Sequence, residues 1–382
     1  MIYKILNLFR KKYVTLNKIE ILRDNLLHNY RYLTSMEKKI KIAPVVKSNG
    51  YGHGITNIAK IVDTSDVSTK PPFLCVDSLY EAYELLKAKI KTPVLITGYT
   101  NPENLKVKIL PFSYAVFTPD LAKAINDYQP EAGVHIFVDT GMRREGIRIE
   151  ELPEFLESLK KLPNLKIEGL MSHLASSESR QDPLFLNQIN QFKKAKEICR
   201  KAGINPKWFH ISATGGIINP ETRPIIAEVS NLARAGLAMY GFSSSTFDHN
   251  LKPALKLTTK IVQIKKVLKG EKIGYDGTPT AKKDLIIGVL PIGYYDGVDR
   301  RLSGKGIFLV DNIECPILGK VSMNINIIDI SNILNPTIGQ EIVVYSESPE
   351  DRNSVENCAK ICKTIPYDLL VNLTETTKRV IV

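Results

Sequence analysis

Between Ile40 and Gly241, short runs of β-branched and other apolar residues alternate with longer stretches in which apolar residues recur every three or four positions. The short runs are typical of strands and the longer stretches of helices, so a repeated βα unit is predicted. Helical patterns fill the gaps at residues 120–128, 152–162 and 184–202. The expected strands are KIAPVVK near residue 41, PFLCVDS near 72, PVLITGY near 93, SYAVFTP near 113, VHIFVDT near 134, KIEGLMSH near 166, WFHISAT near 208 and ARAGLAMYG near 233. Eight strands with intervening helices in about 200 residues predict an α/β fold of the (β/α)8 TIM-type barrel class.

The pattern changes after Gly241, where strand-like runs follow one another without long helices between them. Gly, Asp and Asn turns separate the runs LTTKIVQIKKV, DLIIGVLPIGYYDG, GIFLVDN, ECPILGKVSM, NIIDI and EIVVYS, and a short helix is expected at residues 354–363. We therefore predict two domains, a barrel at residues 13–241 and a smaller, mostly β carboxyl-terminal domain at residues 242–382. Residues 1–12 form a short extension, and whether they pack on the second domain is left open.

Charge and cysteine content narrow the class of protein. The net charge of +12 would suit a nucleic-acid-binding protein, but the lysine clusters are short, dispersed and free of interleaved aromatic residues. Apolar runs fall short of the roughly 18 residues that a membrane span needs. The first residues lack the order of a secretory signal, so we expect a cytoplasmic protein that binds neither nucleic acid nor membrane. The five scattered cysteines predict reduced, buried thiols, and no metal site is expected.

Candidate chemistry lies where the barrel strands end, because the carboxyl ends of the strands carry the functional groups of this fold. The first strand ends in VVKSNGYGHG, which places Lys47 at the barrel mouth. A lysine at a strand end can form a Schiff base with an aldehyde cofactor, and the alternative is an ordinary surface lysine. Gly50, Gly52 and Gly54 favour the first reading, because glycine permits tight turning and close backbone approach.

The last two strand ends predict a site for a phosphate group. Arg234 lies beside Gly236 and Leu237 in the eighth, where backbone N–H groups can cradle a phosphate, and Thr214 in the seventh adds a hydroxyl. A reactive lysine opposite such a cradle is the outline of a pyridoxal-phosphate site.

The fifth and sixth strand ends add groups for a substrate. The segment VDTGMRREG brings Asp139, Thr140, Arg143 and Arg144, and an arginine there can clamp a carboxylate. His173 in MSHL and His210 in WFHISAT are further candidates, each with a buried core histidine as the alternative.

These segments together resemble the alanine racemase family. VVKSNGYGHG is similar to its pyridoxal-phosphate attachment motif, and VDTGM, MSHLA, RAGLAMYG, IGYDGTPTA, GYYDGVDR, GKVSM and IPYDLL resemble its later motifs in the same order, from about Tyr13 to the end of the chain. The resemblance implies a pyridoxal 5'-phosphate-dependent isomerase, a barrel followed by a β domain, and a head-to-tail homodimer whose two sites are each built from both chains.

The resemblance also implies a role for each matching residue. Lys47 matches the Schiff-base lysine, and Tyr275 matches the opposing base, which the partner subunit contributes. Arg234 matches the arginine that bonds the pyridine nitrogen, with His173 close to it. The phosphate contacts correspond to Tyr51, Thr214, Gly236, Leu237 and Tyr367. The substrate carboxylate would be held by Arg144 and by the backbone of Met323, with Tyr294 in the access channel.

The implied reaction is the interconversion of L-alanine and D-alanine. Inverting an α-carbon requires a proton to leave one face and return to the other, which two bases, Lys47 and Tyr275, would provide. Arg234 cannot protonate the pyridine nitrogen, because a guanidinium stays charged, so the electron sink would be partial.

Several positions depart from the family pattern. Phe137 stands where many members carry a carbamylated lysine that steadies the substrate-binding arginine, so the orientation of Arg144 is open. Asn324 replaces an aspartate, Ala213 an asparagine and Lys320 an arginine. The departures concern the preferred substrate more than the type of reaction.

Other functions remain as alternatives. They are a racemase of broader or different amino-acid specificity, a non-catalytic pyridoxal-phosphate carrier, and a barrel-type decarboxylase. A carrier would not need a second base such as Tyr275, and a decarboxylase would ordinarily place an acid, not Arg234, beside the pyridine nitrogen.

Overall fold

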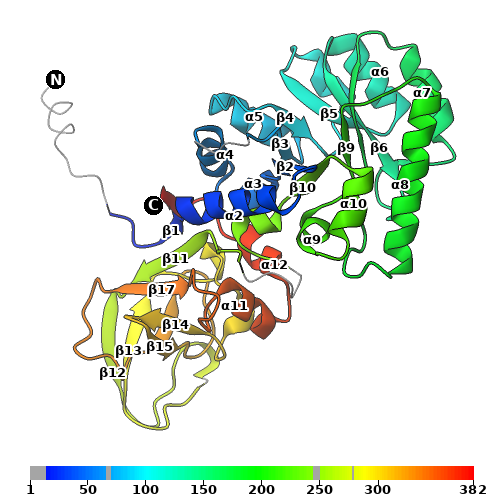
Figure 1. The fold of residues 1–382 in the computed structure, drawn as a ribbon. Helices are drawn as coiled ribbons and strands as arrows, with labels where there is room; N and C mark the ends of the chain where they lie inside the picture. The colour runs from blue at the N-terminus through cyan, green and yellow to red at the C-terminus, as the bar shows by residue number, and fades with distance from the viewer. Residues whose placement is uncertain (1–13, 66–69, 244–249, 278) are drawn as a thin grey trace, which may run out of the picture. The chain divides into compact units, whose positions relative to one another are not determined.

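The structure is a computed structural model that describes residues 14–65, 70–243, 250–277 and 279–382. The expected extension at residues 1–12 lies outside the described residues. The chain divides into two compact units, of which one spans Leu22–Ala254 and the other joins Leu255–Val382 to the segment that ends at Ile21. Figure 1 shows the elements of both units.

The first unit contains all eight predicted strands, so the barrel prediction is confirmed. They are β2 (Lys41–Pro44), β3 (Leu74–Val76), β4 (Val94–Ile96), β5 (Phe112–Val116), β6 (Gly133–Asp139), β8 (Lys166–Met171), β9 (Trp208–His210) and β10 (Leu232–Ala235). Each pairing that the structure records among them is parallel. A bridge between Val45 and Cys75 joins β2 to β3. Hydrogen bonds of 3.1 Å from Asn231 N to Phe209 O and 3.0 Å from Arg234 N to Ser212 O join β9 to β10 and close the ring.

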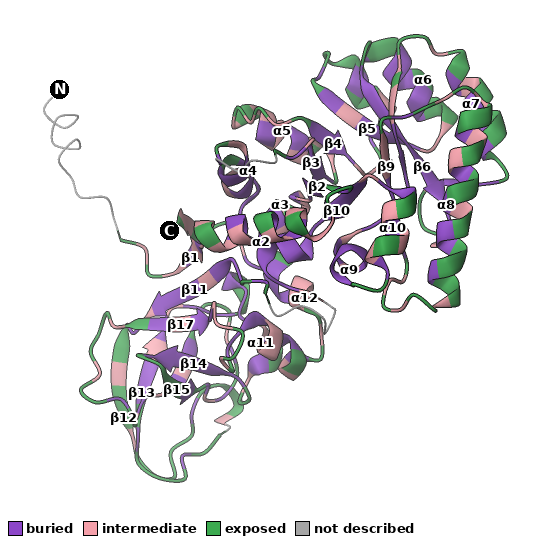
Figure 2. Ribbon diagram, in the orientation of Figure 1, coloured by how far each residue is buried: buried purple, intermediate pink, exposed green. Residues whose placement is uncertain are grey.

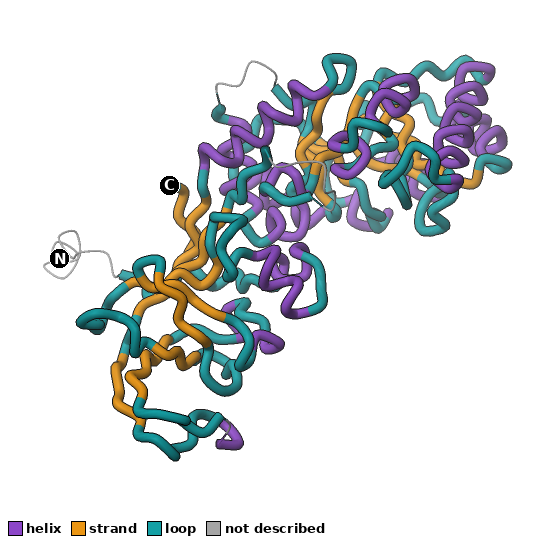
Figure 3. Tube along the Cα trace, turned by 60° about the horizontal axis from the view of Figure 1, so that its bottom comes forward, coloured by secondary structure: helices purple, strands orange, loops and turns teal. Residues whose placement is uncertain are grey.

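Helices surround the strands of this unit (Figures 1 and 3). The longer ones are α2 (Arg23–Met36), α4 (Ile55–Asp63), α5 (Leu79–Lys87), α6 (Pro119–Tyr128), α7 (Leu152–Lys160), α8 (Pro183–Lys201) and α10 (Arg223–Val229). Short turns of helix, α3 (Lys47–Tyr51), η1 (Pro102–Lys106), α9 (Thr214–Ile218) and η2 (Leu237–Tyr240), and the two-residue strand β7 (Ile147–Arg148) complete the unit. The three helices predicted from periodicity correspond to α6, α7 and α8.

Burial explains why the sequence pattern identified these elements. Every residue of β6 is buried, as expected of a parallel strand covered on both faces, and such strands have nearly continuous apolar sequences. Helix α8 instead buries one stripe, formed by Phe185, Gln188, Ile189, Phe192, Ala195 and Cys199. Figure 2 shows this contrast, with the barrel strands purple and α8 partly green. Asp182 accepts a hydrogen bond from Leu184 N and caps the start of α8, with Pro183 in the first turn.

The second unit contains two antiparallel-rich sheets and two short helices. One sheet has the order β15–β14–β17–β11–β1–β18, and the other has the order β12–β13–β16. Their strands are β1 (Lys18–Ile21), β11 (Leu255–Lys260), β12 (Gln263–Val267), β13 (Leu285–Leu290), β14 (Ile307–Val310), β15 (Ile313–Pro316), β16 (Asn326–Asp329), β17 (Glu341–Tyr345) and β18 (Lys378–Ile381). The helices are α11 (Val355–Cys362), at the predicted place, and α12 (Pro366–Val371). The mostly β character of this part of the chain is confirmed.

Strand β1 differs from the sequence-based assignment. The sequence placed residues 13–21 with the barrel, whereas β1 pairs antiparallel with β11 and parallel with β18. Its burial alternates, because Ile19 and Ile21 are buried while Lys18 and Glu20 are partly exposed. The alternation indicates a strand at the face of a sheet, but its pairing partners lie more than 200 residues away in sequence, so local pattern could not identify them.

In the described part of the chain, no helix combines the length and apolar character needed to cross a membrane. All five cysteines are buried and unbridged, in agreement with the predicted buried thiols.

Candidate active site

Lys47 lies three residues after the end of β2, as the first residue of α3, at the carboxyl end of the barrel strands. The preceding backbone is fixed by hydrogen bonds of 2.8 Å from Val45 N to Ala235 O and from Val46 N to Cys75 O, which bind it to the strands on either side. The Lys47 side chain is 38% exposed, and its Nζ donates to Asp77 Oδ1 at 2.8 Å. The amine is therefore both accessible and oriented.

A left-handed turn follows Lys47. Ser48, Asn49 and Tyr51 have φ values of 53°, 54° and 50°, and the intervening Gly50 has 60°. Left-handed geometry costs roughly 1–2 kcal/mol for each L-residue, so neighbouring groups must hold it. Ser48 N donates to Glu81 Oε1 at 2.6 Å, and Asn49 Oδ1 accepts from Ile55 N at 3.0 Å. The tight turn expected from the glycines is confirmed, although three non-glycine residues share its geometry.

Glu81 holds this turn from the start of α5. Its other oxygen, Oε2, accepts from Asp77 N at 2.8 Å, and the residue forms a capping box with Ser78. One carboxylate therefore fixes both the turn after Lys47 and the backbone of Asp77, the hydrogen-bond partner of Lys47.

Groups suited to a phosphate come together at the ends of β9 and β10. The buried Thr214 Oγ1 accepts from Gly236 N at 3.2 Å and from Ala238 N at 3.4 Å. A Cβ at Gly236 would lie 2.5 Å from the Tyr51 hydroxyl oxygen, so glycine is needed for the tyrosine to reach this place. Leu237 begins η2 beside them. Two backbone N–H groups and two hydroxyls thus converge on one small region of the barrel mouth.

Arg234 is buried at the end of β10, and both of its terminal nitrogens have partners. Its NH1 donates to His210 Nδ1 at 2.7 Å and to His210 O at 3.0 Å, and its NH2 donates to Ser172 O at 2.6 Å and His173 Nδ1 at 3.2 Å. Burial lowers the pKa of Arg234 to about 10, so the guanidinium remains charged at neutral pH. Burial, with Arg234 and then Arg144 and Lys47 adding positive charge, lowers the pKa of His173 to about 3. His173 is consequently neutral and can accept from Arg234.

His210 combines the two sequence-based alternatives, because it is a core histidine that also supports Arg234. Its Nε2 lies 2.8 Å from His135 Nδ1 in the middle of β6. Because Arg234 donates to Nδ1 of His210, the proton of the neutral ring sits on Nε2 and points to His135. His135 was not identified from the sequence, since a single histidine inside an apolar run gives no signal of a partner 75 residues away.

The loop after β6 carries the candidate substrate-binding arginine. Asp139 Oδ1 accepts from Gly141 N at 2.8 Å and from Arg143 N at 3.1 Å, and Oδ2 accepts from Arg143 NH1 at 3.2 Å. Arg144 Nε donates to Glu145 Oε2 at 2.6 Å. The two adjacent arginines therefore have different acidic partners.

The remaining candidates lie in the second unit, on turns. Tyr275, in η3 (Tyr275–Gly277), is 67% exposed, and the next residue, Asp276, forms an ion pair with Lys320. Tyr294 N donates to Ser322 O at 3.0 Å, which brings its turn against the segment that contains Met323. The predicted site residues are thus divided between the two units. The barrel unit contains Lys47, Tyr51, Arg144, His173, Thr214, Arg234, Gly236 and Leu237, and the second unit contains Tyr275, Tyr294, Met323 and Tyr367.

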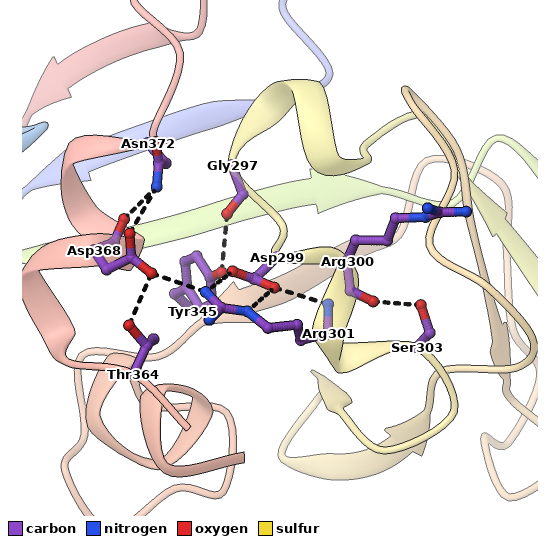
Figure 4. Close-up of polar contacts among 9 residues, drawn as sticks. All are labelled: Gly297, Asp299, Arg300, Arg301, Ser303, Tyr345, Thr364, Asp368 and Asn372. Atoms are coloured by element: carbon purple, nitrogen blue, oxygen red, sulfur yellow. Dashed lines mark hydrogen bonds and ion pairs between the residues drawn. The ribbon is translucent and has the colours of Figure 1, made fainter. Parts of the chain in front are cut away.

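Tyr367 lies on α12. Figure 4 shows the ion-pair cluster that ties α12 to the short helix η5 (Arg300–Leu302). Arg301 donates from Nε to Asp299 Oδ1 at 2.9 Å and from NH2 to Asp299 Oδ2 at 2.6 Å. The same NH2 donates to Asp368 Oδ2 at 2.8 Å, and Thr364 Oγ1 donates to that oxygen at 2.8 Å. The hydrogen bond from Arg301 lowers the pKa of Asp368 and that of Asp299. We call Asp299, Arg301 and Asp368 the α12 clamp.

These features define a class: a barrel protein with an oriented lysine, a cluster of phosphate-suited groups and a buried arginine at the carboxyl ends of its strands, followed by a β domain. Comparison with known proteins identifies the family within this class. The profile of the alanine racemase N-terminal domain matches residues 21–244, and that of the C-terminal domain matches residues 254–381. The chain belongs to the alanine racemase family, as its motifs predicted.

Relatives cover nearly the whole chain. An alanine racemase of Borreliella burgdorferi is 32% identical over 97% of this chain and 99% of its own length. Alanine racemase 1 of Clostridium acetobutylicum is 31% identical over 94% of each chain. Among solved structures, an alanine racemase of Clostridium difficile 630 superposes with a TM-score of 0.88 at 28% identity, covering 97% of both chains. One from Bacillus anthracis, with bound L-Ala-P, has a TM-score of 0.86 at 28% identity, covering 97% of this chain and 96% of that one.

Three supporting acids were missed by reading the sequence alone. Asp77 follows β3 on the strand next to β2, so the rule that functional groups follow strand ends could have identified it. Glu81 could have been recognised as the last residue of a capping box, S-x-x-E, although not as the partner of the turn after Lys47. The contact between Glu145 and Arg144 could not be predicted from the sequence, because it depends on the conformations of the two side chains.

Proposed function

We propose that this protein is a pyridoxal 5'-phosphate-dependent isomerase that interconverts L-alanine and D-alanine. The oriented amine of Lys47 carries the proposal, together with the phosphate-suited groups Thr214, Gly236 and Tyr51 at the end of the neighbouring strand β10. The names and full-length similarity of its relatives support the choice of alanine as substrate.

The residues present fit the cofactor. An aldehyde needs an accessible amine, and Lys47 is 38% exposed with its Nζ directed by a carboxylate at 2.8 Å. A phosphate needs converging donors, which the backbone at Gly236 and Leu237 and the hydroxyls of Thr214 and Tyr51 would supply, with Tyr367 from α12. A pyridine nitrogen would accept from Arg234, which His173 and His210 hold in place.

The protein's own groups would carry the proton transfer. The bound cofactor supplies an electron sink that makes the α-hydrogen of the amino acid acidic. Lys47 removes or returns the proton on one face of the α-carbon, and Tyr275 of the partner subunit does so on the other. Arg144 and the backbone N–H of Met323 hold the substrate carboxylate, and Tyr294 narrows the access path. Arg234 stays charged and gives no proton to the ring, which keeps the sink weak and disfavours side reactions.

The proposed assembly is a homodimer in which each site uses residues of both chains. The cytoplasmic location expected from the sequence stays a prediction.

Chiral chromatography tests the proposal directly. Purified protein is incubated with pyridoxal phosphate and, separately, with each L-amino acid, and the products are resolved on a chiral column. We expect D-alanine from L-alanine and loss of about 10²–10⁴-fold in rate for Lys47→Ala, since removing a general base has an effect of this size. Borohydride reduction and peptide mapping should place the pyridoxyl group on Lys47.

Three other results would change the assignment. Bound cofactor without any D-amino acid would indicate a carrier. A different D-amino acid as the main product would indicate another specificity. A pyridoxyl label on a different lysine would remove Lys47 from its role.

A further inference from the structure

Arg144 has one acidic partner among the contacts that the structure records in its described part. Its Nε donates to Glu145 Oε2 at 2.6 Å, and the two side chains are about half exposed. The neighbouring Asp139 instead accepts from Gly141 N, Arg143 N and Arg143 NH1.

Phe137, two residues before Asp139, offers Arg144 no polar group. It is 6% exposed and packs with Ala115 and Met171 in an apolar cluster, which Phe117 joins from the side. The rings of Phe137 and Phe117 meet edge to face, with centroids 6.0 Å apart. Phe137 is therefore a core residue.

Glu145 faces the same small cavity as the candidate site. The residues around this cavity include Phe137, Arg144, Glu145, Ser172 and His173. Arg144 is close enough to Arg234 for its positive charge to add to the effect of burial on the pKa of Arg234. Arg144, Glu145 and His173 thus line one small cavity, and Glu145 lies beside the Arg144 guanidinium.

We propose that Glu145 is a positioning residue, which fixes the guanidinium of Arg144 for a substrate carboxylate. A guanidinium has five N–H donors, one on Nε and two on each terminal nitrogen. Glu145 engages Nε, so the four donors of NH1 and NH2 remain for a carboxylate, which arginine binds bidentately. The inference rests on the proposed function, in which Arg144 binds the carboxylate of alanine.

The site would consequently accept ligands that carry a small carboxylate, and Glu145 would act on their binding more than on the proton transfer itself. Because Arg144 would hold the carboxylate equally in the ground state and the transition state, losing its support should raise KM and leave kcat nearly unchanged.

The test compares Glu145→Ala and Glu145→Gln in the cofactor-loaded enzyme. Propionate, which has the carboxylate but no amine, is titrated by calorimetry, and KM and kcat are measured for L-alanine. We expect Glu145→Ala to weaken propionate binding and raise KM by about twofold to fivefold, because an ion pair between half-exposed side chains is screened by water. Glu145→Gln should fall between Ala and wild type, because its amide oxygen can still accept from Nε.

Asp24→Asn is a matched control. Asp24 pairs with the adjacent Arg23 at 3.4 Å at the start of α2, so this variant also removes an acid from a neighbouring arginine and should behave like wild type. Cofactor absorbance and melting temperature are recorded for each variant. If Glu145→Ala unfolds, Glu145→Gln decides, since it preserves size and should still raise KM.

Two results separate this inference from the proposed function. Suppose that the enzyme racemises alanine but both Glu145 variants keep the wild-type propionate affinity and KM. This result would overturn the role of Glu145 and leave the proposed function intact. A wild-type protein that forms no D-alanine would refute the proposed function. Propionate binding that still depends on Glu145 would then support the carboxylate site.

Discussion

At the scale of single residues, Tyr275 supplies the most direct test of a two-base reaction. If Tyr275 handles the proton of the L-isomer and Lys47 that of the D-isomer, Tyr275→Phe should lose α-hydrogen exchange from L-alanine by about 10²–10⁴-fold. Exchange from D-alanine should be affected far less, because Lys47 is intact. Proton NMR of each isomer in deuterated water measures both rates.

A second exposed tyrosine provides the control for this variant. Tyr128, at the end of α6, is 40% exposed and belongs to no proposed site, so Tyr128→Phe should exchange both isomers at wild-type rates. Equal losses for L- and D-alanine in Tyr275→Phe would mean that the hydroxyl serves another purpose than proton transfer on one face.

Single residues also show where sequence reasoning stops. Lys47 could be predicted because the strand end and the glycines after it are local features. The pairing of Lys47 with Asp77 depends on which strand lies beside β2, and the contact between His210 and His135 depends on the interior of the closed barrel. Phe137 illustrates the same limit, because its sequence position suggested a missing anion but not that Glu145 would lie against Arg144.

At the scale of elements, the α12 clamp should influence both stability and phosphate binding. Arg301→Met removes the side-chain hydrogen bonds to Asp299 and Asp368 that tie α12 to η5. Because these groups are screened by solvent, the loss in unfolding free energy at neutral pH should be small. Looser placement of Tyr367 should weaken binding of pyridoxal phosphate but not of pyridoxal, which lacks the phosphate.

The clamp also predicts a direction for the dependence of stability on pH. Its aspartates have lowered pKa values in the folded state, so their stabilising effect is fully present above the ordinary value of 3.8 and is lost as pH falls through the folded values. The stability difference between wild type and Arg301→Met should therefore be constant near neutrality and shrink in acid, as urea titrations would measure.

Another arginine of the same unit provides the control for the clamp. Arg352 pairs with Glu314 at 2.8 Å away from α12, and Arg352→Met should leave the affinities for pyridoxal phosphate and pyridoxal unchanged. If Arg301→Met weakened both ligands equally, the clamp would not act through Tyr367.

Elements differ in how well the sequence predicts them, for a physical reason. Most residues of the barrel strands are buried, so these strands leave short apolar runs, and α8 buries one stripe, so it leaves a helical period. Strands β1 and β18 have only four residues each and depend on pairing between the two ends of the chain. Short helix α12 was part of a matched motif, but its periodicity was too brief to predict a helix.

At the scale of the whole molecule, the division into two units places the two proposed bases on different parts of the chain. Lys47 belongs to the unit Leu22–Ala254, and Tyr275 belongs to the unit that includes Leu255–Val382. The change from βα repeats to strands after Gly241 predicts two parts, although the second unit begins at Leu255 and also includes the segment that ends at Ile21. A site that needs both residues must therefore be assembled either within one chain or between two.

Mixing two inactive variants distinguishes these arrangements. Lys47→Ala and Tyr275→Phe proteins, each nearly inactive, are combined under conditions that exchange subunits. In a two-fold hybrid with shared sites, one site receives both damaged residues, and the other receives intact Lys47 from one chain and intact Tyr275 from the other. Random exchange makes half of the dimers hybrids with one good site each, so activity should recover to about a quarter of wild type.

If both bases came from one chain, every hybrid site would lack one base. Proven subunit exchange, for example by mass spectrometry of differently tagged chains, without recovery of activity would then establish self-contained protomers.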